Sequence, residues 1–214
     1  SPDVNLAAAN KAIAENQSSA SNDVDATKEV GTSDSKTSEQ GTNQQLEEQA
    51  QKAIEDANEA EVVKEQQRLA FSYQLSFAKE RGLPVIVHSR NAFEDCLTLI
   101  DKSGVDWRKI VFHCFSEGVT QMEQIMERGG RASFTGILTF GKNGSLREAA
   151  LRQGMENLMI ETDSPYLAPE PRRGKVNEPA FLAYLGQFAA SLFDVPEDFL
   201  AQKTFENTCE FYRT

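Results

Sequence analysis

The sequence is poor in histidine and cysteine, and it has no long apolar run. Among its 214 residues there are two histidines and three cysteines. The cysteines are Cys96, Cys114 and Cys209, an odd number without CxxC spacing, so they fit reduced thiols better than a disulfide framework. No apolar run approaches the roughly 18 residues of a membrane span, and we expect no signal peptide. We therefore expect a cytoplasmic protein without a membrane partner.

Basic residues are also few, and the charge is unevenly spread. The net charge is −11, and residues 1–66 alone carry 14 acidic and 5 basic side chains. An acidic chain is a weak non-specific binder of DNA, because affinity for phosphate depends on lysine and arginine. Metal ions can supply the missing positive charge locally, so a nuclease is not excluded.

The N-terminal third lacks the apolar residues of a folded core. Residues 16–45 are mostly Asn, Gln, Ser, Thr, Gly and acidic residues, a composition that predicts disorder. A short helix is expected at 3–15, and a long helical pattern runs from about Gln44 to Glu80. This helix is expected to end at Arg81-Gly82, since glycine is typical of helix C-termini.

Short apolar runs alternate with helical patterns after Pro84. Strands are expected at 84–88, 109–113, 131–137 and 157–161. Helices are expected at 90–102, 117–128, 145–153, 178–193 and 196–212. Such alternation predicts an α/β fold with a parallel sheet, and four units are half of a (β/α)8 TIM-type barrel.

We therefore expect two regions. Residues 1–65 form an acidic, low-complexity and partly helical segment that is largely disordered. Residues 66–214 form a partial barrel of about four βα units.

Both histidines stand at the ends of predicted strands. His88 follows Pro84-Val-Ile-Val, His113 follows Lys109-Ile-Val-Phe, and Asp163 follows the fourth apolar run. In α/β folds, sites are built at the carboxyl ends of the strands. Imidazole and carboxylate groups bind divalent metals, which activate water for hydrolysis. The pattern predicts a metal site of His88, His113 and Asp163, with Asp163 also catalytic. The alternative is that both histidines are bonded to the backbone at the core or its rim.

Two arginines are candidates for binding phosphate. Arg90 follows His88 closely, and Arg173 lies in the basic run 172–175 after Asp163. A guanidinium group can bind phosphate through two parallel hydrogen bonds. The alternatives are a salt bridge from Arg90 to a helix carboxylate and a solvated loop around Arg173.

Taken together, these phrases resemble the TatD family of metal-dependent deoxyribonucleases over roughly residues 66–212. The matching stretches are Pro84–Arg90, Val111–Ser116, Glu161–Leu167, Arg173–Pro179 and Thr204-x-x-Asn207. Several long motifs in the same order make the resemblance specific. It implies a (β/α)8 barrel with a two-metal site (Mg, Mn or Zn) that hydrolyses phosphodiester bonds of DNA. On that analogy His88 and His113 bind one metal, and Asp163 binds the other or serves the attacking water.

The sequence departs from the family pattern in one respect. The family's N-terminal His-x-His strand and its Gly-Glu-Ile-Gly-Leu-Asp-like phrase have no counterpart here, so the chain resembles strands five to eight. We expect that the chain is a fragment, or pairs with itself or with a separate half-barrel. One alternative is a degenerate, non-catalytic relative that serves as a protein-interaction module. Another is a hydrolase of the same barrel type that acts on amides or lactones.

Overall fold

The structure is a computed structural model that describes residues 35–212. The chain divides into two compact units, Ser1–Glu59 and Ala60–Thr214. The sequence-based boundary after residue 65 stays a prediction, and the short helix expected at 3–15 lies outside the described residues. Among those residues, no helix combines the length and the apolar character that crossing a membrane requires.

Helix α2, Ser35–Arg81, is the longest element and belongs to both units. It ends where the sequence predicts, and Gly82 follows with a φ of 64°. It begins earlier than predicted, so the disorder expected for 16–45 is wrong over 35–45; the remainder of that prediction lies outside the described residues. An established helix adds a hydrogen bond for each residue it gains, which lets it extend into a sequence of modest propensity.

All strands are parallel and follow one another across the sheet in the order β1-β2-β3-β4. Their bounds are β1 Val85–Val87, β2 Ile110–Phe112, β3 Arg131–Phe134 and β4 Met159–Ile160. Each strand lies within its predicted run but is shorter. The predicted α/β class and partial barrel are confirmed.

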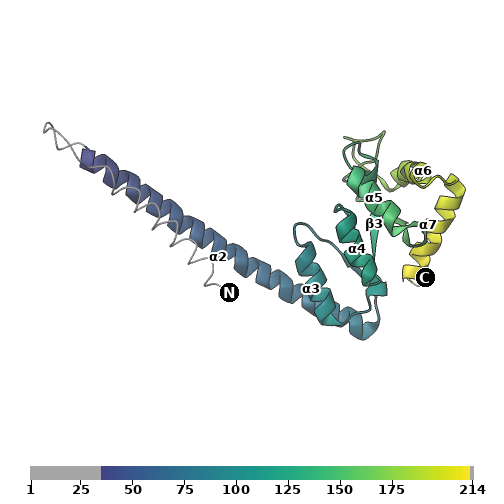
Figure 1. The fold of residues 1–214 in the computed structure, drawn as a ribbon, viewed down its shortest axis with the longest axis horizontal. Coiled ribbons are helices and arrows are strands. Elements are labelled where there is room, and N and C mark those ends of the chain that lie inside the picture. The colour runs from purple at the N-terminus through teal and green to yellow at the C-terminus, as the bar shows by residue number, and fades with distance from the viewer. Residues whose placement is uncertain (1–34, 213–214) are drawn as a thin grey trace. The chain divides into compact units, whose positions relative to one another are not determined.

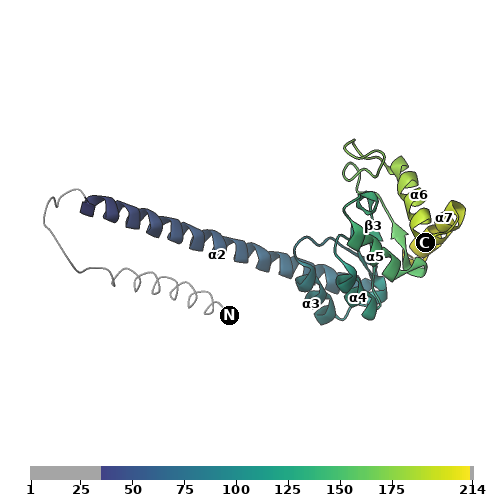
Figure 2. The same ribbon diagram turned by 45° about the horizontal axis from the view of Figure 1, so that its top comes forward.

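The helices between the strands and after the last one also follow the prediction, with ends shifted by a few residues. They are α3 Phe93–Ser103, α4 Val119–Glu127, α5 Gly144–Gln153, α6 Leu182–Phe193 and α7 Glu197–Tyr212. Short 3₁₀ turns are η1 Trp107–Lys109, η2 Gly136–Thr139, η3 Met155–Asn157 and η4 Pro179–Phe181. Helices α4 and α5 lie side by side against β3, and α6 and α7 lie against β4 (Figures 1 and 2).

The two faces of the sheet differ because side chains alternate along each strand. Val87, Phe112 and Phe134 point toward the helices and are at most 2% exposed in the main core. Residues of the other parity point to the opposite face. There Val111 and Met159 form a small separate cluster with Phe211 of α7. We call this second side the open face.

The third strand ends before its predicted limit at residue 137. Gly136 begins η2 and packs under the loop that follows β4. A Cβ atom at Gly136 would lie 2.1 Å from the backbone oxygen of Leu167. The chain therefore turns away at Gly136, because only glycine allows this close approach of the two backbones.

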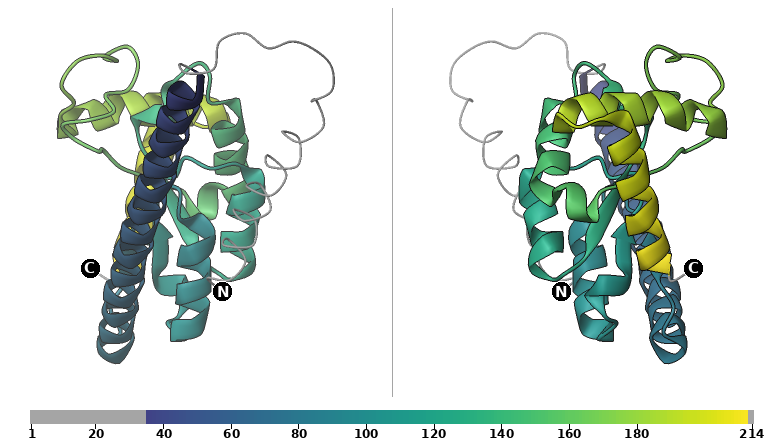
Figure 3. Two further views of the ribbon diagram at one scale, coloured as in Figure 1. Left: turned by 90° about the vertical axis from the view of Figure 1, so that its left-hand side faces the viewer. Right: turned by 90° about the vertical axis from the view of Figure 1, so that its right-hand side faces the viewer.

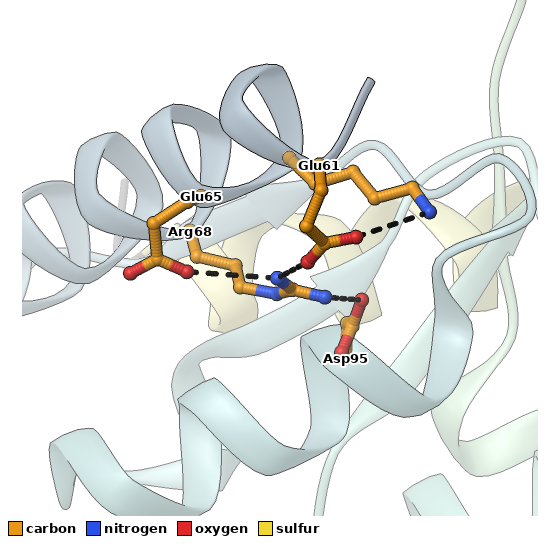
Figure 4. Close-up of polar contacts among 5 residues, drawn as sticks. Glu61, Glu65, Arg68 and Asp95 are labelled. Carbon is orange, nitrogen blue, oxygen red and sulfur yellow. Dashed lines mark hydrogen bonds and ion pairs between the residues drawn. The ribbon is translucent and has the colours of Figure 1, made fainter. Parts of the chain in front are cut away.

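Arg68 ties α2 to α3 within the unit Ala60–Thr214 (Figure 4). Its guanidinium lies 2.9 Å from Glu61 and 3.5 Å from Glu65 on the same helix, and 3.2 Å from Asp95 on α3. The hydrogen bonds that Arg68 donates to Glu61 and then to Asp95 raise the pKa of its guanidinium. The arginine is thus already neutralised by carboxylates of the chain.

Candidate metal centre

His113 lies directly after β2 and is held by a carboxylate from the end of β4. Its Nδ1 atom lies 2.8 Å from Oε1 of Glu161. When Nδ1–H donates to this carboxylate, Nε2 keeps its lone pair free to bind a metal. The imidazole is therefore fixed in the tautomer and orientation that a metal ligand needs.

Asp163 lies near the other nitrogen of the His113 ring, and the ring of His88 is nearby. The Nε2 atom of His113 lies 3.6 Å from Oδ1 of Asp163. The rings of His88 and His113 have their centroids 5.9 Å apart. The structure therefore brings together the three side chains that the sequence predicted as metal residues. The alternative, histidines bonded to the backbone, does not hold for His113.

The ligand set fits a divalent ion in its chemistry but is incomplete. Two ligand atoms about 2.1 Å from one ion lie roughly 3.4 Å apart in tetrahedral geometry, close to the separation of His113 and Asp163. Over residues 35–212, however, no group of three or more His, Cys, Asp or Glu side chains could hold a metal ion as it stands. His113 and Asp163 are thus two ligands of a candidate site, and His88 lies near them.

The carboxylate of Glu161 has two further donors besides His113. The backbone N–H of Cys114 lies 2.8 Å from its Oε1, and the hydroxyl of Ser133 lies 2.7 Å from the same atom. Cys114 has a φ of 47°, a left-handed conformation in the turn that carries this N–H. Groups from β3 and from the end of β2 thus converge on one oxygen at the end of β4 and fix its position.

The thiol of Cys114 is not prepared as a nucleophile. Burial raises its pKa, and the charges of Asp163 and Glu161 raise it further, against a hydrogen bond with Thr135 that lowers it. Since the thiolate is the reactive form, Cys114 serves here through its backbone.

The loop that carries Asp163 is fixed by a buried amide. Asn177 is 3% exposed, and its Nδ2 donates to the backbone oxygen of Tyr166 at 2.7 Å. Its backbone N–H donates to Pro165 at 3.0 Å. Asn177 therefore closes the loop onto itself just beyond Asp163.

The two predicted phosphate ligands lie in different environments. Arg90 is exposed and lines a cavity of about 600 Å³ together with His88 and Phe71. Among the described residues Arg90 forms no ion pair with a carboxylate, contrary to the salt-bridge alternative. The guanidinium of Arg173 lies 4.3 Å from the ring centroid of Phe140 and 3.9 Å from Glu170.

Glu161 is the residue that the sequence-based prediction missed. It stands two positions before Asp163, and side chains two apart on an extended strand share a face. A metal-bound histidine usually donates its other ring N–H to a carboxylate or carbonyl oxygen. A carboxylate at this spacing could therefore have been identified as that acceptor.

The parallel strands, with imidazole and carboxylate groups gathered at their carboxyl ends, define an α/β protein of the barrel class. The model of the family described as TatD related DNase matches residues 24–213. The chain belongs to this family.

Three known proteins illustrate the relationship. The chain is 37% identical over 149 residues to "Uncharacterized metal-dependent hydrolase YcfH" of Escherichia coli K12, covering 70% of this chain and 56% of the relative. It is 34% identical over 157 residues to "3'-5' ssDNA/RNA exonuclease TatD" of Yersinia pseudotuberculosis, covering 69% and 59%. The crystal structure of YJJV, a TatD homolog from Escherichia coli K12, has a TM-score of 0.65 at 27% identity and covers 70% and 57%. The chain thus spans just over half the length of these relatives.

Proposed function

We propose that this chain carries the metal-binding part of a TatD-type hydrolase that cleaves phosphodiester bonds of DNA. The observation that carries the proposal is the convergence of His113 and Asp163, 3.6 Å apart, with Glu161 holding the far nitrogen of the imidazole. Relatives named as metal-dependent hydrolases, and one named as an exonuclease of single-stranded DNA and RNA, support this direction.

The roles of the residues follow from their positions. His113 and Asp163, with His88 beside them, bind a divalent ion (Mg, Mn or Zn), which supplies Lewis acidity and a water of lowered pKa. Glu161 keeps the Nε2 lone pair of His113 directed at the site. In this proposal Asp163 also accepts a proton from the attacking water.

Arg90 is the better of the two candidates for contact with substrate phosphate. It is exposed beside His88, and within the described residues no carboxylate neutralises it. Arg173 stacks on Phe140, which leaves it a weaker candidate. The substrate would therefore approach along the cavity beside His88.

A nuclease assay tests the proposal. A single-stranded, end-labelled DNA oligonucleotide is incubated with the chain and Mn²⁺, and cleavage is followed by gel electrophoresis. We expect cleavage that EDTA abolishes and that Asp163→Asn lowers by about 100-fold or more. The variant Asp194→Asn, at the exposed turn between α6 and α7, should cleave like wild type.

A chain that binds metal but leaves DNA uncut would contradict the nuclease activity. The incomplete ligand set gives a specific reason to consider the non-catalytic alternative, a relative that only engages another protein. The amide or lactone hydrolase is tested in the same way, with small chromogenic substrates in place of the oligonucleotide. The cytoplasmic location stays a prediction.

A further inference from the structure

The loop between β4 and α6 carries three cationic side chains within four positions, Arg172, Arg173 and Lys175. The loop begins directly after β4 and contains Asp163, so it leaves the sheet at the same end as the metal centre. Figure 3 shows it beyond the sheet and next to the start of α6. An acidic chain thus has a basic run in the loop that supplies a candidate metal ligand.

The backbone of this basic run is anchored by hydrogen bonds. The backbone N–H of Glu170 donates to the hydroxyl of Thr139 at 2.9 Å. The N–H of Arg172 donates to the carbonyl of Pro169 at 2.7 Å, and the N–H of Lys175 donates to the carbonyl of Arg172 at 3.0 Å. Because the backbone is fixed, the side chains of the run start from defined positions.

Aromatic rings hold both arginines of the run. The guanidinium of Arg172 lies 5.7 Å from the ring centroid of Phe181 and 5.5 Å from that of Tyr184. It also donates a hydrogen bond of 3.1 Å to the hydroxyl of Tyr184. The guanidinium of Arg173 lies 4.3 Å from the ring centroid of Phe140. Stacking engages the face of a guanidinium and leaves N–H groups at its edge for an anion. Both arginines are therefore held in position with donors still available.

The charge of these two arginines is less neutralised than that of others in the unit Ala60–Thr214. Four arginines elsewhere in the unit have a carboxylate oxygen within 3.1 Å: Arg68, Arg108, Arg128 and Arg152. In the loop, Arg173 lies 3.9 Å from Glu170, and such a pair of exposed side chains contributes little. Arg172 forms no ion pair with a carboxylate among the described residues. The loop thus retains positive charge at the end of the sheet where an anionic substrate would react.

We propose that Arg172 and Arg173 bind phosphate groups of the substrate strand that flank the one cleaved at the metal centre. The inference rests on the proposed function and adds the form of the substrate, an extended nucleic-acid strand and not an isolated phosphodiester. Arg172 is anchored to η4 and α6, and Arg173 to Phe140 after η2. Anchoring to different segments suits two phosphates along a strand better than one. Arg90, beside His88, remains the candidate for the cleaved phosphate.

Such contacts have a defined consequence for specificity. Phosphate contacts position a strand but carry no sequence information. Binding energy gained away from the reacting bond can be used to orient that bond for reaction. Loss of the two arginines should therefore weaken binding of all oligonucleotides alike. It should leave the hydrolysis of a small diester unchanged, because a small diester has no flanking phosphate.

Fluorescence anisotropy of a labelled single-stranded DNA oligonucleotide, titrated with the 214-residue chain in EDTA, tests the proposal without cleavage. Arg172→Gln/Arg173→Gln should weaken binding by about 10-fold or more, as the loss of charge-assisted hydrogen bonds commonly does. The slope of log affinity against log salt concentration should become shallower by about 1.4, since each phosphate contact on a single strand contributes about 0.7.

The matched control is Arg108→Gln/Arg152→Gln. It removes the same charge from two exposed arginines that are already paired with Asp106 and Glu123. This control should bind the oligonucleotide like wild type. Equal weakening in the two double variants would overturn the proposal, because the effect would then reflect net charge alone. A wild-type chain that does not bind the oligonucleotide would also overturn it.

Two further measurements separate the role of the arginines from loss of structure and from failure of the proposed function. Mn²⁺ binding to the loop variant should match wild type, and its loss would overturn the proposal, since the arginines would then act by holding the loop that carries Asp163. With Mn²⁺, the loop variant should hydrolyse bis(p-nitrophenyl) phosphate like wild type but cleave the oligonucleotide about 10-fold more slowly at low concentration. If wild type cleaves neither substrate, the proposed function fails, while anisotropy still decides whether the loop binds a nucleic-acid strand.

Discussion

The two faces of the sheet are built from the same strands, yet they differ in what covers them. One packs against the helices of the main core, and the other carries the small cluster of Val111, Met159 and Phe211. On the helix-covered face, Phe112 is 2% exposed and Phe134 is 0% exposed. On the open face, Ile86 is 56% exposed in the strand next to Phe112. On this side, His88, His113 and Glu161 follow the carboxyl ends of β1, β2 and β4. The helix-covered face thus supplies most of the core, while the open face combines a small buried cluster with polar groups at the ends of its strands.

This contrast shows that neighbouring residues of one strand can have different roles. Because their side chains alternate, some stabilise the core while others contribute to the site. Changes on the covered face should lower the free energy of unfolding and leave binding intact if the chain still folds. Changes at the polar residues where the strands of the open face end should alter metal binding with little loss of stability, and a change at the exposed Ile86 should also cost little. The following predictions test this division, from the largest expected effect to the smallest.

Phe112→Ala should lower the free energy of unfolding by about 3–5 kcal/mol, because it leaves a large cavity in the packed core. Ile86→Ala should cost less than about 1 kcal/mol, because Ile86 is 56% exposed. Urea unfolding followed by circular dichroism gives both values. Equal losses would show that the open face is also part of the core.

Gly136→Ala should lower the free energy of unfolding by roughly 1–3 kcal/mol, because the added Cβ forces two backbones apart. The contact is with Leu167, in the loop after Asp163. The matched control is Gly141→Ala, where an added Cβ would meet no atom within 4 Å. Thermal melting of both variants measures the difference, and an unchanged Gly136→Ala protein would contradict the close packing.

Glu161→Gln should weaken binding of Mn²⁺ by about 10–100-fold. Substituting the residue that accepts the hydrogen bond from a ligating histidine commonly lowers metal affinity by this factor. Stability should change little, because the amide oxygen can still accept a hydrogen bond from Ser133 or Cys114. Glu148→Gln, at an exposed position on α5, is the control for a lost carboxylate. Equal affinities for the two variants would remove Glu161 from the site.

Cys96, on the covered side, should make stability decline in alkaline solution. Burial raises the pKa of its thiol, so the unfolded chain loses the proton at a lower pH than the folded chain. Its contribution to stability is complete below the unfolded pKa of about 8.5 and is lost as pH rises through the higher folded value. Melting temperature should therefore fall less steeply above pH 8.5 in Cys96→Ala than in wild type. If the melting temperatures of wild type and Cys96→Ala fell equally steeply, the thiol of Cys96 would not be the cause of the alkaline decline.

The sequence was sufficient for the order of elements and for the position of the two histidines. Apolar runs ending in His88 and His113 predicted the strands and the face on which their ends meet. It could not define where each strand stops, because the end of β3 depends on a backbone contact between Gly136 and Leu167, far apart in sequence. The full length of α2 also escaped prediction, since extension of a helix depends on the stability of its neighbouring turns.

The role of Glu161 illustrates a different limit. The role of its carboxylate depends on tertiary contacts. It is evident only when β2, β3 and β4 bring His113, Ser133 and the Cys114 N–H around it. Likewise, the helical pattern that predicts α2 does not tell which side of the helix is buried, and the structure shows that Leu69, Tyr73 and Phe77 lie on the side away from the core. Long-range pairing of elements, which local patterns do not encode, decides both cases.

Calorimetric titration of Mn²⁺ into the wild-type chain and into a His88→Ala/His113→Ala double variant is the most direct test of the central claim. The account predicts measurable binding to wild type that disappears in the double variant, with both proteins folded. Absence of binding to wild type, or equal binding to both, would contradict a metal centre at the ends of β1 and β2.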